Sequence, residues 1–396
     1  MPEITEGLPP LNELFNVIHQ RPFSLLFANY SLLLGLAGGI AVIWAVNAWL
    51  GRRDTPGYRL ALPMAVSFVI AGFMNVLAEV KQPGRLIYGY LYGWTYGDTA
   101  IIKYGIILLP LFLALCWWTM FQALDPAALE RCVARLPRPL KALVSFMALW
   151  SWRYRLLDHP RLRAGILTAM ILLGVFAASY SGIFLMNEHG VPIWNTPAQV
   201  LVFLFTGLAG GAALFVLGVP ILHRLALGSW SRPDRRYHWI MLGCAVFALL
   251  VWYMWLWWIN YFGDVENRRM ATVLFGPFGE ILAWQVLGVG LVVPILLLLI
   301  GGPRRPWATA VAGLGILWGA YAVRFVILIG GQALNHSGAG YLSFTPDHVV
   351  LWYTTVDAIL ALSLPALLAL LLPLERGDGQ ADMGTEVRHS EGRIAS

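Results

Sequence analysis

Apolar residues run through this chain in long blocks, and short polar segments separate them. Each block is close to the roughly 20 residues that a helix needs to cross a bilayer. The second block is the least uniform, because Pro63, Asn75 and Glu79 interrupt it. The pattern predicts an all-α polytopic membrane protein with about nine transmembrane helices, at residues 23–50, 59–80, 99–122, 162–187, 195–222, 237–262, 278–300, 307–330 and 347–373.

Lys and Arg are distributed unevenly between the two ends of these spans. The odd-numbered loops and the C-terminal tail carry 20 of the 27 Lys and Arg residues, and the N-terminus and even-numbered loops carry five. Basic loops stay in the cytoplasm. We therefore expect a multi-pass protein of a bacterial or archaeal cytoplasmic membrane, with an extracytoplasmic N-terminal segment (1–22) and a disordered cytoplasmic tail (374–396). The basic excess is a topology signal, so we expect no nucleic-acid partner.

A short glycine-rich sequence occurs twice. Gly35–Ala41 in the first span reads GLAGGIA, and Gly207–Ala213 in the fifth span reads GLAGGAA. Both contain the spacing of small residues that allows helix backbones to approach in lipid. Four spans separate the copies, which predicts two parallel four-helix bundles, 23–187 and 188–330. Residues 331–373 would then form an outer loop and a ninth helix.

Composition narrows the class further. Hydrophobic residues make up 59% of the chain and charged residues 12%, against about 25% charged in soluble domains. Cys116, Cys132 and Cys244 are far apart, so we expect no iron–sulfur cluster and no structural zinc in this chain. The eight His residues fall in loops, tails or helix ends, so we also expect no haem. No motif indicates hydrolysis.

Polar residues within the spans gather toward the outer side of the membrane. Charged groups in a bilayer are costly and need a reason, so this asymmetry predicts a polar pocket that opens outward. Asp357 lies near the middle of the ninth span. The outward residues are Asn29, Tyr30, Asn75, Glu79, Lys103, Tyr180, Asn260, Glu280 and Arg324.

Several of these residues also have a purely structural interpretation. Glu79, Lys103 and Arg324 could extend to the aqueous interface. Asn75 could hold two helices together, and Tyr180 could belong to an aromatic belt.

Three segments resemble one known family. Tyr180-Ser181-Gly182 followed by Gly190–Pro197 (GVPIWNTP) resembles the signature of the polysulfide reductase membrane subunits, the NrfD/PsrC-like family. The glycine run Gly35–Gly39 and the loop Gln82–Arg85 are also similar to that family, although Pro83 here precedes the Gly-Arg pair. The resemblance covers the first eight spans and leaves out the ninth.

The resemblance implies a respiratory function in a complex. The chain would be the quinone-reactive membrane subunit of an oxidoreductase and would not be catalytic alone. Its substrate would be menaquinone or ubiquinone, bound near the outer surface in the first bundle. Its partners would be an extracytoplasmic subunit with four iron–sulfur clusters and a molybdopterin catalytic subunit. The family pattern places quinone contacts at Asn29 or Tyr30 and at Tyr180.

These residues suggest a mechanism. Tyr180 and Asn29, with Tyr30 as the alternative to Asn29, would hydrogen-bond the quinone oxygens. Glu79 would accept the quinone protons, which would exchange with the outer side of the membrane. Arg85 and Lys103 would orient Glu79 or attract the partner, while Trp194 and Asn195 would fix the start of the fifth helix. Asn75 and Arg324 complete the predicted supporting residues.

Two questions stay open from the sequence alone. The same pocket could oxidise quinol for a reductase or reduce quinone for an oxidase, and the partner would set the terminal substrate. A secondary transporter would also account for buried charges, although transporters usually carry inverted repeats and charges at the midplane. A passive membrane anchor is the third possibility.

Overall fold

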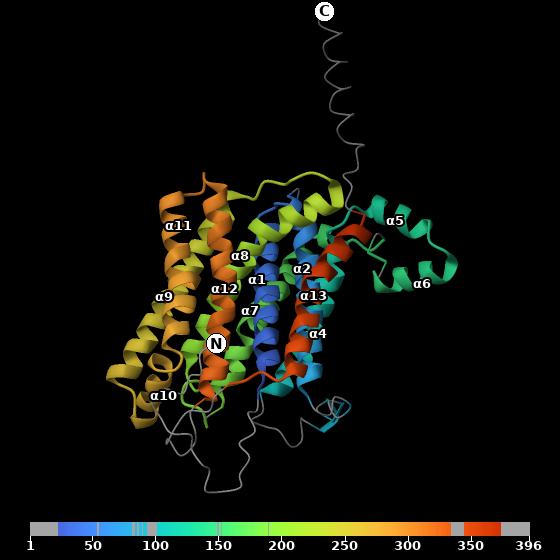
Figure 1. The fold of residues 1–396 in the computed structure, drawn as a ribbon. Helices are drawn as coiled ribbons and strands as arrows, with labels where there is room; N and C mark the ends of the chain where they lie inside the picture. Colours follow the sequence, from blue (N-terminus) through green and yellow to red (C-terminus); the bar gives the residue numbers. More distant parts are fainter. Residues whose placement is uncertain are drawn as a thin grey trace, which may run out of the picture.

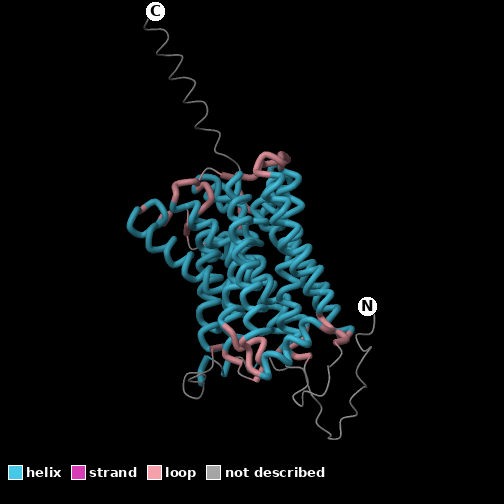
Figure 2. The backbone as a smooth tube through the Cα atoms, turned by 90° about the vertical axis from the view of Figure 1, so that its left-hand side faces the viewer, coloured by secondary structure: helices cyan, strands magenta, loops and turns pink. Residues whose placement is uncertain are grey.

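The computed structural model describes residues 23–53, 55–80, 84, 87–88, 90–92, 101–148, 150–151, 153–188, 190–333 and 344–373. Over these residues every regular element is helical, and nine helices are long and apolar enough to cross a membrane. Figures 1 and 2 show them standing side by side as one bundle. The prediction of an all-α membrane protein with nine spans is confirmed.

The spans agree closely with the predicted apolar blocks. They are α1 (Leu25–Trp49), α2 (Pro56–Glu79), α4 (Ile102–Gln122), α7 (Pro160–Met186), α8 (Pro197–Leu227), α9 (Arg235–Tyr261), η3 with α11 (Ile281–Val292 and Val293–Gly301), α12 (Pro306–Gly331) and α13 (His348–Leu371). Shorter helices between them are α5 (Pro126–Ala134), α6 (Arg138–Met147), η2 (Leu156–Asp158) and α10 (Val265–Phe275). The segments 1–22 and 374–396 lie outside the described residues, and the division into two bundles stays a prediction.

Ordinary capping chemistry starts several of the spans. Ser24 caps α1 by accepting a hydrogen bond from the Leu26 amide, and Thr196 caps α8 in the same way through Ala198. Pro at the first helical position, as at Pro160 and Pro306, fixes a helical φ angle where no intrahelical donor is needed.

The second span is a continuous helix despite its polar residues and Pro63. The hydroxyl of Ser67 donates to the Pro63 carbonyl at 2.7 Å, and the side-chain amide of Asn75 donates to the Ala71 carbonyl at 3.1 Å. Within lipid, a polar side chain can satisfy itself on its own helix in this way.

The two glycine-rich repeats meet at the centre of the bundle. A Cβ atom added to Gly207 would lie 2.8 Å from the Gly35 carbonyl oxygen, and one added to Gly211 would lie 2.6 Å from the Gly39 carbonyl carbon. The backbones of α1 and α8 therefore touch directly, which only glycine permits. Because α1 also packs against α2 and α7, it is the central helix of the half that contains the predicted quinone site.

Candidate functional site

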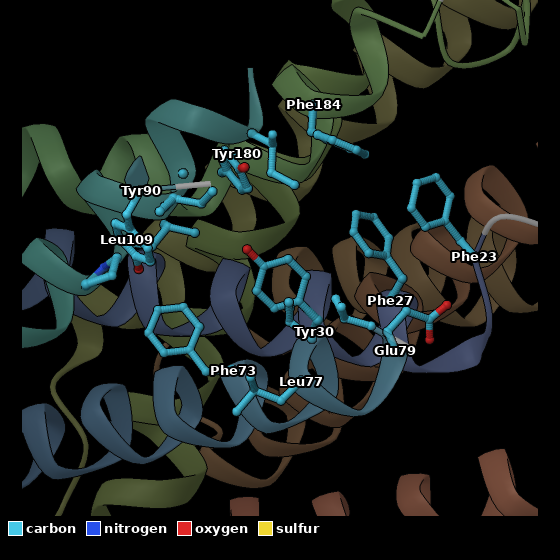
Figure 3. Close-up of a pocket in the computed structure, with 16 residues that line it drawn as sticks. Phe23, Phe27, Tyr30, Phe73, Leu77, Glu79, Tyr90, Leu109, Tyr180 and Phe184 are labelled. Carbon is cyan, nitrogen blue, oxygen red and sulfur yellow. The ribbon is translucent and has the colours of Figure 1, made fainter. Parts of the chain in front are cut away.

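A cavity of about 350 Å³ lies between α1, α2, α4 and α7. That volume is within the range of small-molecule sites, and such sites combine apolar walls with a few placed polar groups. The cavity is at the end of the bundle where α1 begins and α2 ends, and Figure 3 shows its aromatic walls. These walls include Phe23, Phe27, Phe73 and Phe184.

Tyr30 of α1 and Tyr180 of α7 line this cavity, and Figure 3 shows both rings at it. Each residue is only 4% exposed. Neither phenol hydroxyl hydrogen-bonds to any residue in the described part of the chain. Buried hydroxyls normally have a partner, so these two are available to a ligand that brings its own oxygen atoms.

Gly105 of α4 makes room for the Tyr180 ring. A Cβ atom at this position would overlap the Tyr180 hydroxyl and the ring carbon that carries it. Sequence reasoning did not select Gly105, since a single glycine in an apolar helix carries no signal of its own. The need for glycine at this position follows only from the packing of α4 against α7.

Glu79 is at the end of the cavity next to Phe23 and Phe27 (Figure 3). One carboxylate oxygen accepts the Ser24 backbone N–H at 2.6 Å, and the other pairs with the Ser24 hydroxyl. The carboxylate thus ties the end of α2 to the start of α1. Ser24 was missed as a site residue, although a Ser directly before an apolar helix is a recognisable capping signal.

An aromatic and amide cluster supports the same end of α1. The Phe23 ring stacks on Phe27 with centroids 4.5 Å apart and lies 5.7 Å from the Trp194 ring. Gln332 accepts the Phe23 amide at 3.0 Å and donates to the Phe23 carbonyl at 3.2 Å. The Trp194 indole donates to the Ile327 carbonyl at 2.7 Å. Trp194 therefore supports the cavity from behind and does not line it.

Two other predicted supporting residues lie away from the cavity lining. Asn195 is exposed beside the Thr196 cap, and Lys103 is 8% exposed near the start of α4, with its ammonium 5.4 Å from the Tyr104 ring centre. Arg85 lies outside the described residues.

Arg324 is completely buried between α12 and α8. Its guanidinium donates to the Ala320 carbonyl at 2.8 Å, the Thr206 hydroxyl at 3.2 Å and the Phe203 carbonyl at 3.3 Å. It also stands 4.9 Å from the centre of the Phe203 ring. These neutral acceptors hold the charge inside the bundle, so Arg324 does not extend to the aqueous interface.

The cavity brings together Tyr30, Glu79 and Tyr180 among the predicted site residues. Its walls are mainly aromatic and aliphatic, whereas the sequence had suggested a polar pocket. Within the described ranges, no group of three His, Cys, Asp or Glu side chains is arranged to hold a metal ion.

Comparison with known proteins decides the family. The model of the polysulphide reductase NrfD family matches residues 13–335. This chain belongs to that family.

Two members of the NrfD family illustrate the distance of the relationship. Protein NrfD of Escherichia coli K12 is 24% identical over 324 residues, which are 77% of this chain and 93% of that protein. The polysulfide reductase C chain of Wolinella succinogenes is 22% identical over 328 residues, or 77% of this chain and 92% of that protein. The resemblance noted at the Tyr180 and Gly190–Pro197 segments is therefore confirmed at the level of the family.

The cavity falls within the NrfD match, whereas α13 begins after it ends. The additional helix contacts α1 and α2 through what we call the α13 seam, formed by Asn29, Asn75, Thr354 and Asp357. Asn29 donates to the Thr354 hydroxyl at 3.2 Å, and the Asn75 side chain interacts with the Asp357 carboxyl. Asn29, predicted to bind quinone, thus points to α13 and is not part of the cavity lining.

Proposed function

We propose that this NrfD-family chain is the quinone-reactive subunit of a respiratory oxidoreductase complex. The quinone headgroup would occupy the cavity between α1, α2, α4 and α7. The observation that carries this proposal is the pair of buried phenol hydroxyls, Tyr30 and Tyr180, that face an aromatic cavity without partners among the described residues. A quinone is flat and apolar with two oxygen atoms that need hydrogen bonds, which matches this combination of groups.

The reaction requires an exit for both electrons and protons. Quinol oxidation releases two electrons and two protons, and quinone reduction takes up the same number. The electrons would pass to an extracytoplasmic iron–sulfur subunit, the partner that the resemblance to the polysulfide reductase membrane subunits implies. The partner subunit would in turn set the terminal substrate.

The chain's own groups would bind the quinone and move the protons. The Tyr30 and Tyr180 hydroxyls donate to quinone oxygens or accept from quinol hydroxyls. The Glu79 carboxylate, between the cavity and the Ser24 cap, accepts a proton and releases it at the outer end of α2. Phe27 and Phe184 contact the ring and exclude water from it.

The test is quinol turnover by the chain purified with its native partner subunits. Tyr180→Phe removes one hydroxyl and keeps the ring. One neutral hydrogen bond is worth about 1 kcal/mol, so we expect an apparent KM about fivefold higher. Tyr237→Phe is the matched control, because this buried tyrosine near the start of α9 contacts Asn47 and not the cavity.

Two outcomes would reject the proposal. If Tyr180→Phe, Tyr30→Phe and Glu79→Gln all turn over like the wild type in an assembled complex, either the quinone binds elsewhere or the chain is a passive anchor. If Tyr237→Phe is impaired as strongly as Tyr180→Phe, the quinone does not bind in this cavity.

A further inference from the structure

The connection between α4 and α7 contains a helical hairpin that is fixed to the bundle. We call residues Pro126–Met147, which contain α5 and α6, the α5–α6 hairpin. The Trp117 indole of α4 donates to the Met147 carbonyl at 2.8 Å. The Gln122 side chain donates to the Tyr154 carbonyl at 2.7 Å, which joins the segments before and after the hairpin.

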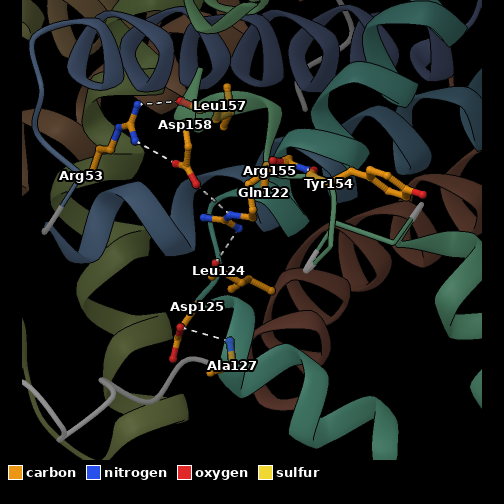
Figure 4. A network of polar contacts seen from close by, with 9 residues as sticks. All are labelled: Arg53, Gln122, Leu124, Asp125, Ala127, Tyr154, Arg155, Leu157 and Asp158. Carbon is orange, nitrogen blue, oxygen red and sulfur yellow. Dashed lines mark hydrogen bonds and ion pairs between the residues drawn. The ribbon is translucent and has the colours of Figure 1, made fainter. Parts of the chain in front are cut away.

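Charged contacts hold the same connection from the other side. Figure 4 shows Arg155 donating to the Leu124 carbonyl at 3.1 Å and pairing with Asp158 at 3.3 Å. Arg53, in the turn between α1 and α2, pairs with Asp158 at 3.4 Å and donates to the Leu157 carbonyl at 3.0 Å. The hairpin therefore has a defined place relative to the spans.

Yet most of the large apolar side chains of α6 are not covered by the described part of the chain. Leu140, Leu143 and Met147 recur at helical spacing on one face and are 47%, 53% and 40% exposed, and Phe146 at the border of that face is 64% exposed. An apolar stripe of this kind on a short helix needs an apolar environment.

Basic residues surround this apolar stripe. Asp125 caps α5, and Asp158 is occupied by Arg53 and Arg155, which leaves Glu130 as the exposed acid within the hairpin. The exposed basic residues of the hairpin and its C-terminal flank are Arg131, Arg135, Arg138, Lys141 and Arg153. Apolar side chains flanked by cations are the signature of helices that lie on an anionic lipid surface.

The position of the hairpin agrees with such a surface. Figure 1 shows α5 and α6 extending sideways from the bundle, toward the same end at which α1 passes into α2. A segment that extends sideways near the end of a membrane bundle enters the boundary between headgroups and acyl chains. From these observations we infer that the α5–α6 hairpin binds anionic phospholipid, with the Leu140–Met147 face among the acyl chains and the basic residues on the phosphates.

Depth measurements test the orientation of α6. Spin labels are placed singly at Leu143→Cys and Lys141→Cys in a background with Cys132 and Cys244 changed to Ser. The purified full chain is then inserted in nanodiscs of phosphatidylcholine and phosphatidylglycerol. We expect lipid-soluble oxygen to reach the label at position 143 and an aqueous nickel chelate to reach the one at 141. Equal access of the nickel chelate to both labels would overturn the inference.

Lipid retention tests the charge. The triple variant Arg135→Gln, Arg138→Gln and Lys141→Gln is compared with Arg304→Gln and Arg305→Gln, an exposed basic pair in the loop between α11 and α12. Phosphatidylglycerol retained per purified chain is measured by mass spectrometry, with the elution profile as the check on folding. We expect an affinity loss of about fivefold per removed cation in the hairpin variant alone. Equal retention by both variants would contradict the inference, as would protection of position 143 only after a soluble protein is added.

Discussion

The start of α1 and the end of α2, which lie at the same end of the bundle, present two faces with different chemistry. Toward α4 and α7 they form the aromatic cavity, where the Tyr30 and Tyr180 hydroxyls have no protein partner among the described residues. Toward α13 they form the seam, where Asn29 reaches Thr354 and Asn75 meets Asp357. Polar groups at a similar depth thus separate into a set that lines the cavity without a protein partner among the described residues and a set that joins helices.

The two faces also differ in how they relate to the family. The cavity lies in the part of the chain that the NrfD model matches, while the partner helix of the seam lies beyond residue 335. Along that helix Asp357, Ala361, Pro365 and Ala369 form one buried stripe at a spacing of four residues. Small residues at that spacing favour helix packing in lipid. We expect the cavity face to bind a ligand and the α13 seam to hold the helices together.

The largest effect is expected from removing both cavity hydroxyls. If Tyr30 and Tyr180 bond different quinone oxygens, the roughly fivefold losses multiply, and the double Phe variant loses about 25-fold in kcat/KM. If they share one oxygen, the double variant resembles the stronger single one. Quinol turnover of the wild type, both single variants and the double variant separates these cases. Normal turnover of the double variant would contradict the assignment of ligand binding to the cavity face.

Crowding the cavity should have the next largest effect. Gly105→Ala places a methyl group on the Tyr180 phenol, and overpacking of this kind costs about 1–3 kcal/mol. We expect turnover to be about tenfold slower with intact assembly. Gly243→Ala in α9 is the matched control, since an added Cβ there meets no atom within 4 Å. Normal activity of Gly105→Ala would show that the position of Tyr180 is unimportant.

Breaking the seam should change stability more than kinetics. Asn29→Ala removes the hydrogen bond to Thr354, and such interhelical bonds are worth about 0.6 kcal/mol on average. We expect a Tm lower by about 1–3 °C and a KM within about twofold of wild type, with Thr354→Val behaving alike. A strong rise in KM for Asn29→Ala alone would return this residue to the quinone site, as the sequence had suggested.

The smallest effect is expected at Asp357. The Oδ1 atoms of Asp357 and Asn75 are buried without hydrogen-bond partners among the described residues, so this contact has more acceptors than donors. Asp357→Asn supplies a neutral donor, and we expect unchanged turnover and an equal or slightly higher Tm. Asp357→Leu is the comparison that removes polarity altogether. A loss of turnover in Asp357→Asn with a normal Tm would give the seam a chemical function.

The comparison of the faces also explains what the sequence could predict. Hydropathy located the nine spans that the described residues contain, because each helix in lipid must satisfy its own backbone and present an apolar surface. The depth of Tyr30, Glu79 and Tyr180 followed from their distance to the helix ends. The depth of a residue along a helix does not show, however, toward which neighbouring helix its side chain points. Asn29 and Tyr30 are neighbours about 100° apart around the helix, and only the placement of α7 and α13 shows which faces the cavity.

The sequence could not identify residues whose contribution depends on packing against distant segments of the chain. Gly105 is needed because the Tyr180 ring packs against it. Gln332 hydrogen-bonds both the N–H and the C=O of Phe23, although it lies 309 residues later in the chain. Neither has a local pattern that marks it. Ser24 did have one, as a capping residue, but its pairing with Glu79 depends on where α2 ends.

The direct contact between the glycines of α1 and α8 has a consequence for biosynthesis. The first span cannot complete its packing until Gly207 and Gly211 of the fifth span have been synthesised. At roughly 5–20 residues per second, this interval is on the order of 10–30 s. During that time an inserted helix with a bare glycine groove is exposed to lipid and to the insertion machinery. The contact between α1 and α8 therefore forms only after the four helices that line the cavity have been synthesised.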